Sequence, residues 1–193
     1  MTNLLQKNIF KAYDIRGIVG DALTEDIVSL IGQSIGSEAS DQKQTSICVG
    51  YDGRLSSPDL CDALTRGLLS TGIDVINIGL VTTPMLYFST HELKTNTGIM
   101  ITGSHNPPEY NGFKIVINTK TLTSEQIQDL YKRIKDGKFA KGNGKLISKK
   151  IQSQYLTKIY EGINLKRPMK VTIDCGNGAA GVCAEELFKG LNL

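Results

Sequence analysis

One stretch of the sequence, "GIMITGSHNPPEYNGFKIV" (residues 98–116), brings together side chains that could perform chemistry. An apolar run that predicts a buried strand ends there, and Ser104 and His105 follow in a loop before Lys114 opens a second strand. Strand ends that break into polar loops are where α/β folds usually place their sites, because the scaffold is rigid and the loop can present side chains. A serine presented in this way could be the nucleophile of a hydrolase or the carrier of a phosphoryl group.

The neighbours of Ser104 favour a phosphoryl carrier. A hydrolase elbow has the pattern G-x-S-x-G, which "TGSHN" lacks, and adjacent side chains in an extended loop point apart, so His105 is not expected to pair with the serine. A phosphate dianion needs positive charge, hydrogen-bond donors and a titratable group near the attacking hydroxyl. The residues that could supply these are Arg16, His105, Asn106 and Lys114.

The loop around the serine is predicted to be stiff. Gly103 removes a Cβ just before Ser104, which allows either close approach to the serine or a positive φ. Pro107 and Pro108 restrict the backbone after it. We therefore expect Ser104 to be held in a preset pose.

Two further motifs leave alternatives open. In "FKAYDIRGIVG", Tyr13 and Arg16 precede a glycine, and the arginine could capture a phosphate or carboxylate or could form a structural ion pair with Asp14. Residues 176–181 spell G-x-G-x-x-G between an apolar run and a predicted helix, as in a dinucleotide fingerprint. The acidic ribose ligand expected some 20 residues later has no position in these 193 residues, and a tight turn needs the same glycines for packing alone.

Composition indicates an ordinary soluble globular protein. The 193 residues are 40% hydrophobic, which is enough for a substantial core, and no apolar run is long enough to cross a bilayer. The N-terminus lacks the features of a signal peptide, so a cytoplasmic protein without a membrane partner is the expectation. The basic stretch 132–150 has a single aromatic residue on which bases could stack, and this favours a solvated linker over a nucleic-acid site. Cys48, Cys61, Cys175 and Cys183 form no C-x-x-C pair and are predicted to be buried free thiols.

Predicted strands and helices alternate along the chain, which indicates an α/β layer architecture. Helices are expected from Thr24, from Pro58 with Ser57 as N-cap, from Pro84, and over 122–137, where Thr123 and Gln126 form a capping box. A domain over 1–137 is predicted to end in a glycine- and lysine-rich linker over 138–152. Residues 153–193 would then give a connecting helix, a buried strand in "MKVTIDC" and the truncated beginning of a second domain.

Four segments, "KAYDIRG", "VGYDGRLSSP", "TGSHNPPEYNGFK" and "DCGNGAAG", resemble the α-D-phosphohexomutase superfamily, and most of all its bacterial phosphomannomutase/phosphoglucomutase branch. The resemblance runs in order from Phe10 to about Ala184. It implies a first domain with a mixed β-sheet sandwiched between helices, followed by the start of a second, similar α/β domain. It also implies a four-domain enzyme, so these residues would be an N-terminal fragment without mutase turnover of its own.

The resemblance implies a reaction and a site. Ser104 would carry a phosphoryl group and pass it to a hexose 1-phosphate of mannose or glucose, and the hexose 1,6-bisphosphate would return its other phosphate to leave the 6-phosphate. By the same match Lys114 would be a general acid/base, His105 would line the site, and Tyr13 and Arg16 would contact substrate or phosphoserine. Mg²⁺ would bind the phosphate on Ser104 and three aspartates of a D-G-D-G-D loop that does not occur in these residues. A nucleotide- or sugar-phosphate-binding module without catalysis is the alternative.

Overall fold

The structure is a computed structural model that describes residues 5–167 and 169–193. Within these residues the strands form one seven-stranded mixed sheet in the order β1-β5-β4-β2-β3-β7, with β6 paired to β5. The neighbours of β2 and β3 run parallel, whereas β5 is antiparallel to β1, β4 and β6. The strands are β1 (Ile15–Ile18), β2 (Ser46–Tyr51), β3 (Asp74–Leu80), β4 (Gly98–Ile101), β5 (Tyr110–Ile117), β6 (Lys120–Thr121) and β7 (Leu146–Ser148).

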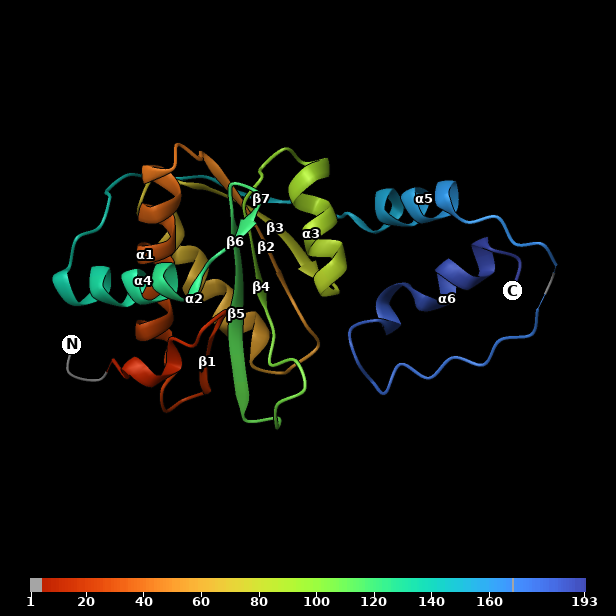
Figure 1. Cartoon of the computed structure of the whole chain (residues 1–193), viewed down its shortest axis with the longest axis horizontal. Helices are drawn as coiled ribbons and strands as arrows, with labels where there is room; N and C mark the ends of the chain where they lie inside the picture. The colour runs from red at the N-terminus through yellow and green to blue at the C-terminus, as the bar shows by residue number, and fades with distance from the viewer. Residues whose placement is uncertain (1–4, 168) are drawn as a thin grey trace.

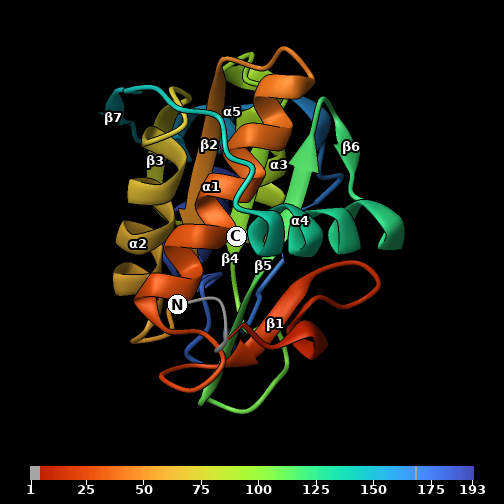
Figure 2. The ribbon, with the colours of Figure 1, turned by 90° about the vertical axis from the view of Figure 1, so that its left-hand side faces the viewer.

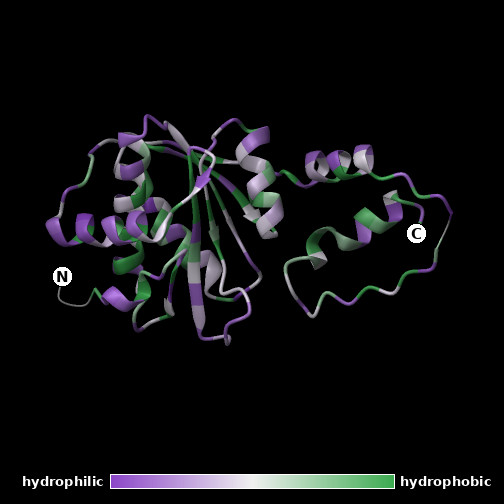
Figure 3. Ribbon diagram, in the orientation of Figure 1, coloured by the Kyte–Doolittle hydropathy of each residue, from purple (hydrophilic) through white to green (hydrophobic). Residues whose placement is uncertain are grey.

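Helices cover both faces of the sheet, as Figures 1 and 2 show, so the expectation of a mixed sheet sandwiched between helices is confirmed. Alternate residues of each central strand enter opposite cores: Val49 and Ile99 pack with α1, α2 and α4, while Cys48 and Met100 pack with α3. Figure 3 shows hydrophobic residues concentrated along these strands. The helices are α1 (Glu25–Asp41), α2 (Ser57–Leu69), α3 (Thr83–Glu92), α4 (Ser124–Asp136), α5 (Gln152–Gly162) and α6 (Gly181–Gly190), and a short 3₁₀ turn spans Lys7–Ile9. None of the described helices combines the length and the apolar character that crossing a bilayer requires.

The predicted helix ends are confirmed at α1 and α4. The hydroxyl of Thr24 accepts a hydrogen bond from the backbone of Ile27, and Thr123 and Gln126 form the full capping box of α4. Gly137 ends α4 with a left-handed φ of 65°. The prediction of Ser57 as N-cap of α2 is wrong, because the helix begins at Ser57 and the Ser57 hydroxyl bonds a carboxylate outside the helix.

Residues 138–152, which the composition predicts to be a solvated linker, are mostly exposed, and part of the segment also pairs with the sheet. Strand β7 pairs in parallel with β3, and Gly142 and Gly144 donate backbone hydrogen bonds of 2.9 Å to Ser70 and Leu69. A Cβ on Gly144 would overlap the backbone of Ile73, so this glycine permits close contact with the sheet. The domain division at this point stays a prediction.

The C-terminal part differs from the prediction at "MKVTIDC" (residues 169–175), which forms no strand among the described residues. Val171 and Ile173 are 42% and 43% exposed because no neighbouring strand covers or pairs with this segment. Figure 1 shows the segment running along the side of α6 that faces away from α5, apart from the sheet. Helix α5 contacts α3 through the edge-to-face ring pair of Phe88 and Tyr155, whose centroids are 5.5 Å apart.

All four cysteines are free thiols. Cys48, Cys61 and Cys183 are buried as predicted, but Cys175 is only partly buried because it lies in the uncovered segment. Burial raises the pKa of the Cys61 thiol to about 11, so this thiol stays protonated at neutral pH. These properties fit packing residues at Cys48, Cys61 and Cys183.

Candidate active site

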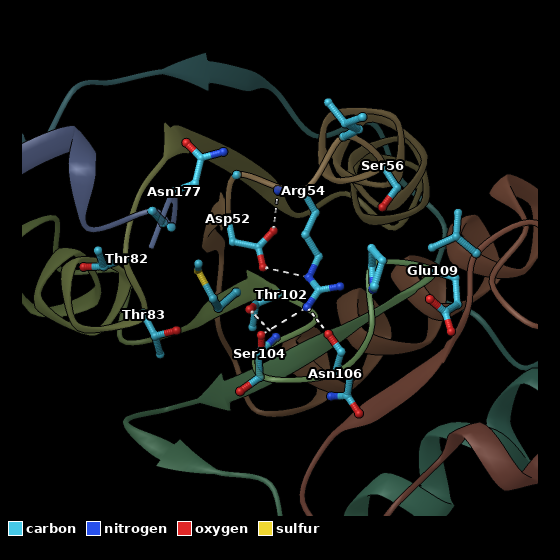
Figure 4. A pocket seen from close by; sticks show the side chains of 17 residues that line it. Asp52, Arg54, Ser56, Thr82, Thr83, Thr102, Ser104, Asn106, Glu109 and Asn177 are labelled. Atoms are coloured by element: carbon cyan, nitrogen blue, oxygen red, sulfur yellow. Dashed lines mark hydrogen bonds and ion pairs between the residues drawn. The ribbon is translucent and has the colours of Figure 1, made fainter. Parts of the chain in front are cut away.

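A cavity of about 740 Å³ lies where the parallel strands β2, β3 and β4 end. The chain crosses from β2 to β3 on one side and returns to β4 on the other, so β2 marks a switch in the direction of the sheet. Crevices at such a switch, outside the carboxyl ends of the strands, are the usual ligand sites of α/β sheets. Side chains from all three strand ends line it, including Asp52, Arg54, Thr83, Thr102, Ser104 and Asn106 (Figure 4).

Ser104 is exposed in this cavity and has a left-handed backbone with a φ of 52°. Its N–H donates to the hydroxyl of Thr102 at 2.9 Å. Left-handed φ values are costly for residues with a Cβ, by about 1–2 kcal/mol, so the surrounding structure must enforce this one. The serine is therefore held, as predicted, in one conformation, which is a strained left-handed turn at Ser104 itself.

His105 lies closer to Ser104 than the sequence predicts. Its Nδ1 is 3.4 Å from the serine Oγ, which is a long hydrogen bond. The expectation that the two side chains point apart is wrong, because it assumed an extended backbone and the positive φ of Ser104 turns the chain instead.

Arg16 and Asn106 are brought together across the sheet edge. The guanidinium of Arg16 donates to the side-chain Oδ1 of Asn106 at 3.4 Å and also forms an ion pair with Asp14. Both readings of Arg16 that the sequence left open are therefore compatible with its position: it is ion-paired, and it reaches the serine loop. Asn106 also donates from its side chain to the carbonyl of Gly103 at 2.7 Å, which closes the loop around Ser104.

Lys114 and Tyr13 are not among the residues that line the cavity. Lys114 lies on β5 directly opposite Met100, a residue that does line it, and directly opposed residues of paired strands share a face of the sheet. Lys114 is partly buried there. Tyr13 precedes β1 and is 76% exposed.

The sequence analysis missed Asp52 and Arg54. Arg54 donates four hydrogen bonds to backbone carbonyls of the serine loop, and Asp52 accepts the N–H of Gly103 at 3.2 Å. The signal was present in "VGYDGRLSSP": a polar D-G-R follows a predicted buried strand, which is the pattern that drew attention to Ser104. Applying the same rule to this strand would have found both residues.

The glycine turn at 176–181 reaches the same cavity. Asn177, Gly178 and Ala179 line it, and Figure 4 shows Asn177 across the cavity from Ser104. Gly176 and Asn177 both have positive φ values, and Gly178 donates to the carbonyl of Cys175 at 2.8 Å, so the glycines form a tight turn. The described residues contain no group of three or more His, Cys, Asp or Glu side chains that could hold a metal ion.

Comparisons with known proteins agree on one family. The family model described as phosphoglucomutase/phosphomannomutase, alpha/beta/alpha domain I, matches residues 7–141. The chain is 47% identical over 187 residues to a phosphomannomutase/phosphoglucomutase of Pseudomonas aeruginosa, covering 97% of this chain and 40% of that protein. It is 49% identical over 189 residues to a phosphoglucomutase of Neisseria meningitidis, covering 97% of this chain and 41% of that protein.

A solved structure gives the same answer. The fold superposes on a phosphoglucomutase/phosphomannomutase family protein of Burkholderia thailandensis with a TM-score of 0.93 at 43% identity, over 97% of this chain and 43% of that one. The chain thus spans about two fifths of the length of these relatives. With the sheet order, the cavity and these matches in agreement, the chain belongs to the phosphoglucomutase/phosphomannomutase family, and residues 7–141 are its alpha/beta/alpha domain I.

Proposed function

We propose that Ser104 carries the phosphoryl group of a phosphohexomutase that interconverts hexose 1-phosphate and hexose 6-phosphate of mannose, glucose or both. The observation that carries the proposal is an exposed serine, held in a left-handed turn, in a cavity at the ends of three parallel strands. The relatives named phosphoglucomutase or phosphomannomutase support it.

The proposed reaction has two transfers. The bond between phosphorus and the Ser104 Oγ breaks as the phosphoryl group passes to the sugar 6-hydroxyl, which loses its proton to a base while the freed Oγ takes up a proton, and this yields the hexose 1,6-bisphosphate. After the bisphosphate reorients, the bond between its 1-oxygen and phosphorus breaks, the phosphoryl group passes to the Ser104 Oγ, which gives up its proton, and the protonated sugar leaves as the 6-phosphate. Such transfers depend mainly on positioning and on neutralising charge, which a fixed serine loop favours.

We assign roles to the neighbouring residues as part of this proposal. Lys114 is the general acid/base, since it occupies the cavity-side face of β5 opposite Met100. His105 lies within 3.4 Å of the Ser104 hydroxyl and would line the phosphate. Arg16, Asn106 and Tyr13 would contact substrate or phosphoserine, and the bond from Arg16 to Asn106 supports the first two.

The described residues do not form a complete Mg²⁺ site, because they contain no cluster of three carboxylate, imidazole or thiolate ligands. The phosphate on Ser104 is the ligand that this chain would supply, and Mg²⁺ bound by a phosphate and a few carboxylates is a common arrangement. We therefore propose that residues 1–193 alone have no mutase turnover, and we route no step through the ion.

The proposal is tested on the complete gene product that contains residues 1–193. After incubation with glucose 1,6-bisphosphate or mannose 1,6-bisphosphate, tryptic mass spectrometry should find one phosphoryl group on Ser104, and Ser104→Ala should abolish both the mark and the interconversion. Lys114→Ala should lower turnover while leaving Ser104 able to bear phosphate. Binding of sugar phosphates without any phosphoserine or turnover would instead favour a binding module and reject the mutase.

A further inference from the structure

Arg54 uses both terminal nitrogens of its guanidinium on the protein backbone. Its two terminal nitrogens donate two hydrogen bonds each, at 2.6–3.1 Å, and all four acceptors are main-chain carbonyls of the loop between β4 and β5 or the first residue of β5. The acceptors belong to Ser104, Asn106, Pro107 and Tyr110. The remaining nitrogen, Nε, lies 3.6 Å from Oδ2 of Asp52 (Figure 4).

This arrangement leaves Arg54 without a donor for a phosphate. A guanidinium has five N–H groups, four of which are committed to carbonyls here, while the fifth belongs to the nitrogen beside Asp52. An arginine that lines a cavity next to a serine would ordinarily be expected to bind the anion. Its hydrogen bonds indicate a different task, holding the loop that presents the serine.

Gly103 and Ser104 show what Arg54 holds in place. A Cβ on Gly103 would overlap the guanidinium carbon and Nε of Arg54, so the glycine is needed because the arginine lies directly on it. The next residue is Ser104 with its left-handed φ of 52°, and the carbonyl of Ser104 accepts from Arg54 at 3.1 Å. The arginine thus forms a hydrogen bond with the backbone of the residue that has the strained left-handed conformation.

Asp52 fixes the arginine and the loop from the opposite side. Its Oδ2 accepts the N–H of Gly103 at 3.2 Å, and its Oδ1 accepts from the Arg54 N–H at 3.1 Å and the Ser57 hydroxyl at 2.7 Å. Ser57 in turn accepts from the buried Asn111 of β5 at 3.0 Å. The side chains of Asp52 and Arg54 are only 14% and 17% exposed, so water competes weakly for these bonds.

We propose that Arg54, oriented by Asp52, is a positioning residue that keeps Ser104 in its left-handed turn and so directs the serine hydroxyl into the cavity. The expected effect on catalysis rests on the proposed mutase function, but the claim that Arg54 holds the turn at Ser104 does not. Positioning of a reacting group within a fraction of an ångström strongly affects rate, so loss of Arg54 should slow phosphoryl transfer without weakening sugar binding.

The first test measures the loop directly by hydrogen exchange of the peptide 102–112. Arg54→Met removes the guanidinium, and Gly103→Ala displaces it while leaving its charge, so the two variants should behave alike. We expect exchange in this peptide to become about tenfold faster or more in both, because several charge-assisted hydrogen bonds are lost. Arg66→Met is the matched control: Arg66 pairs with Glu25 at 2.8 Å on the exposed surface, and its loss should leave the loop unchanged.

Two results would overturn the positioning role. One is unchanged exchange of peptide 102–112 in Arg54→Met. The other is the same acceleration in every peptide, including those of α1 and α4, because Arg54 would then serve overall stability and not the loop.

The second test uses turnover of the complete gene product. In Arg54→Met, kcat should fall about tenfold or more while KM for the hexose 1-phosphate changes by less than about twofold. Arg54→Lys should recover little, since one ammonium cannot span four carbonyls. A raised KM with unchanged kcat would make Arg54 a substrate ligand and refute the proposal. If the wild-type protein lacks turnover but Arg54→Met still shows the faster exchange, the mutase function is rejected and the positioning role of Arg54 stands.

Discussion

Replacing Ser104 by glycine and by alanine separates the strain at this residue from the loss of its hydroxyl. Both variants lack the Oγ, but only alanine keeps the Cβ that opposes a φ of 52°. The left-handed conformation costs a residue with a Cβ about 1–2 kcal/mol. The greater freedom of glycine in the unfolded chain offsets about 0.4–1 kcal/mol of this. We therefore expect Ser104→Gly to be more stable than Ser104→Ala by up to about 1.6 kcal/mol, with a central value of about 0.8 kcal/mol.

The assay is urea unfolding of residues 1–193 followed by circular dichroism, with thermal midpoints as a second readout. A difference of 1 kcal/mol corresponds to about 2–4 °C in a chain of this size. Asp62, exposed in the middle of α2, gives the control pair Asp62→Gly and Asp62→Ala. There alanine should be the more stable by about 1 kcal/mol, so the sign must reverse between the two sites. Alanine being favoured by a similar margin at Ser104 would refute the enforced left-handed turn.

Two further predictions concern the scaffold. The pKa of the buried Cys61 thiol is raised from 9.0 to about 11. Below pH 9 this thiol is neutral in both the folded and the unfolded protein, and between pH 9 and 11 it ionises only in the unfolded protein. The free energy of unfolding should therefore fall by up to about 2–3 kcal/mol between about pH 9 and 11, and more steeply than in Cys61→Ala. The same pH dependence of urea unfolding in both proteins would contradict the raised pKa. Thr123→Ala should lower stability by about 1 kcal/mol through loss of the α4 cap while Thr123→Ser should not, and equal midpoints for all three proteins would show that the cap contributes nothing.

The local elements followed from the sequence because their signals are local. Thr123, Gln126 and Gly137 fix the two ends of α4 through hydrogen bonds and a backbone angle within a few residues, and the sequence shows all three. Strands β2 and β4 were likewise evident as apolar runs that end in polar loops. Ser57 was misassigned by one position because its hydroxyl bonds Asp52, a partner in the preceding loop and not in the helix.

The sequence indicated only part of the candidate site. The sequence pointed to Ser104, His105 and Asn106 because they share one loop. It gave no role to Arg54, because the carbonyls that Arg54 bonds lie about 50 residues away in the chain. It also left two explanations for Gly103, a positive φ or close approach. The positive φ falls on Ser104 and not on Gly103, and the close contact that Gly103 permits is with the guanidinium of Arg54, which lies where a Cβ would be.

By itself the sequence determined the alternation of strands and helices and the caps of α1 and α4, and it predicted a stiff serine loop. Those properties depend on short-range sterics and hydrogen bonding. Only the tertiary structure decided that the ends of β2, β3 and β4 meet at one cavity, that Leu146–Ser148 pair with β3, and that Arg54 spans the serine loop. These depend on sheet order and on backbone groups far apart in the chain, about which a side-chain pattern carries no information.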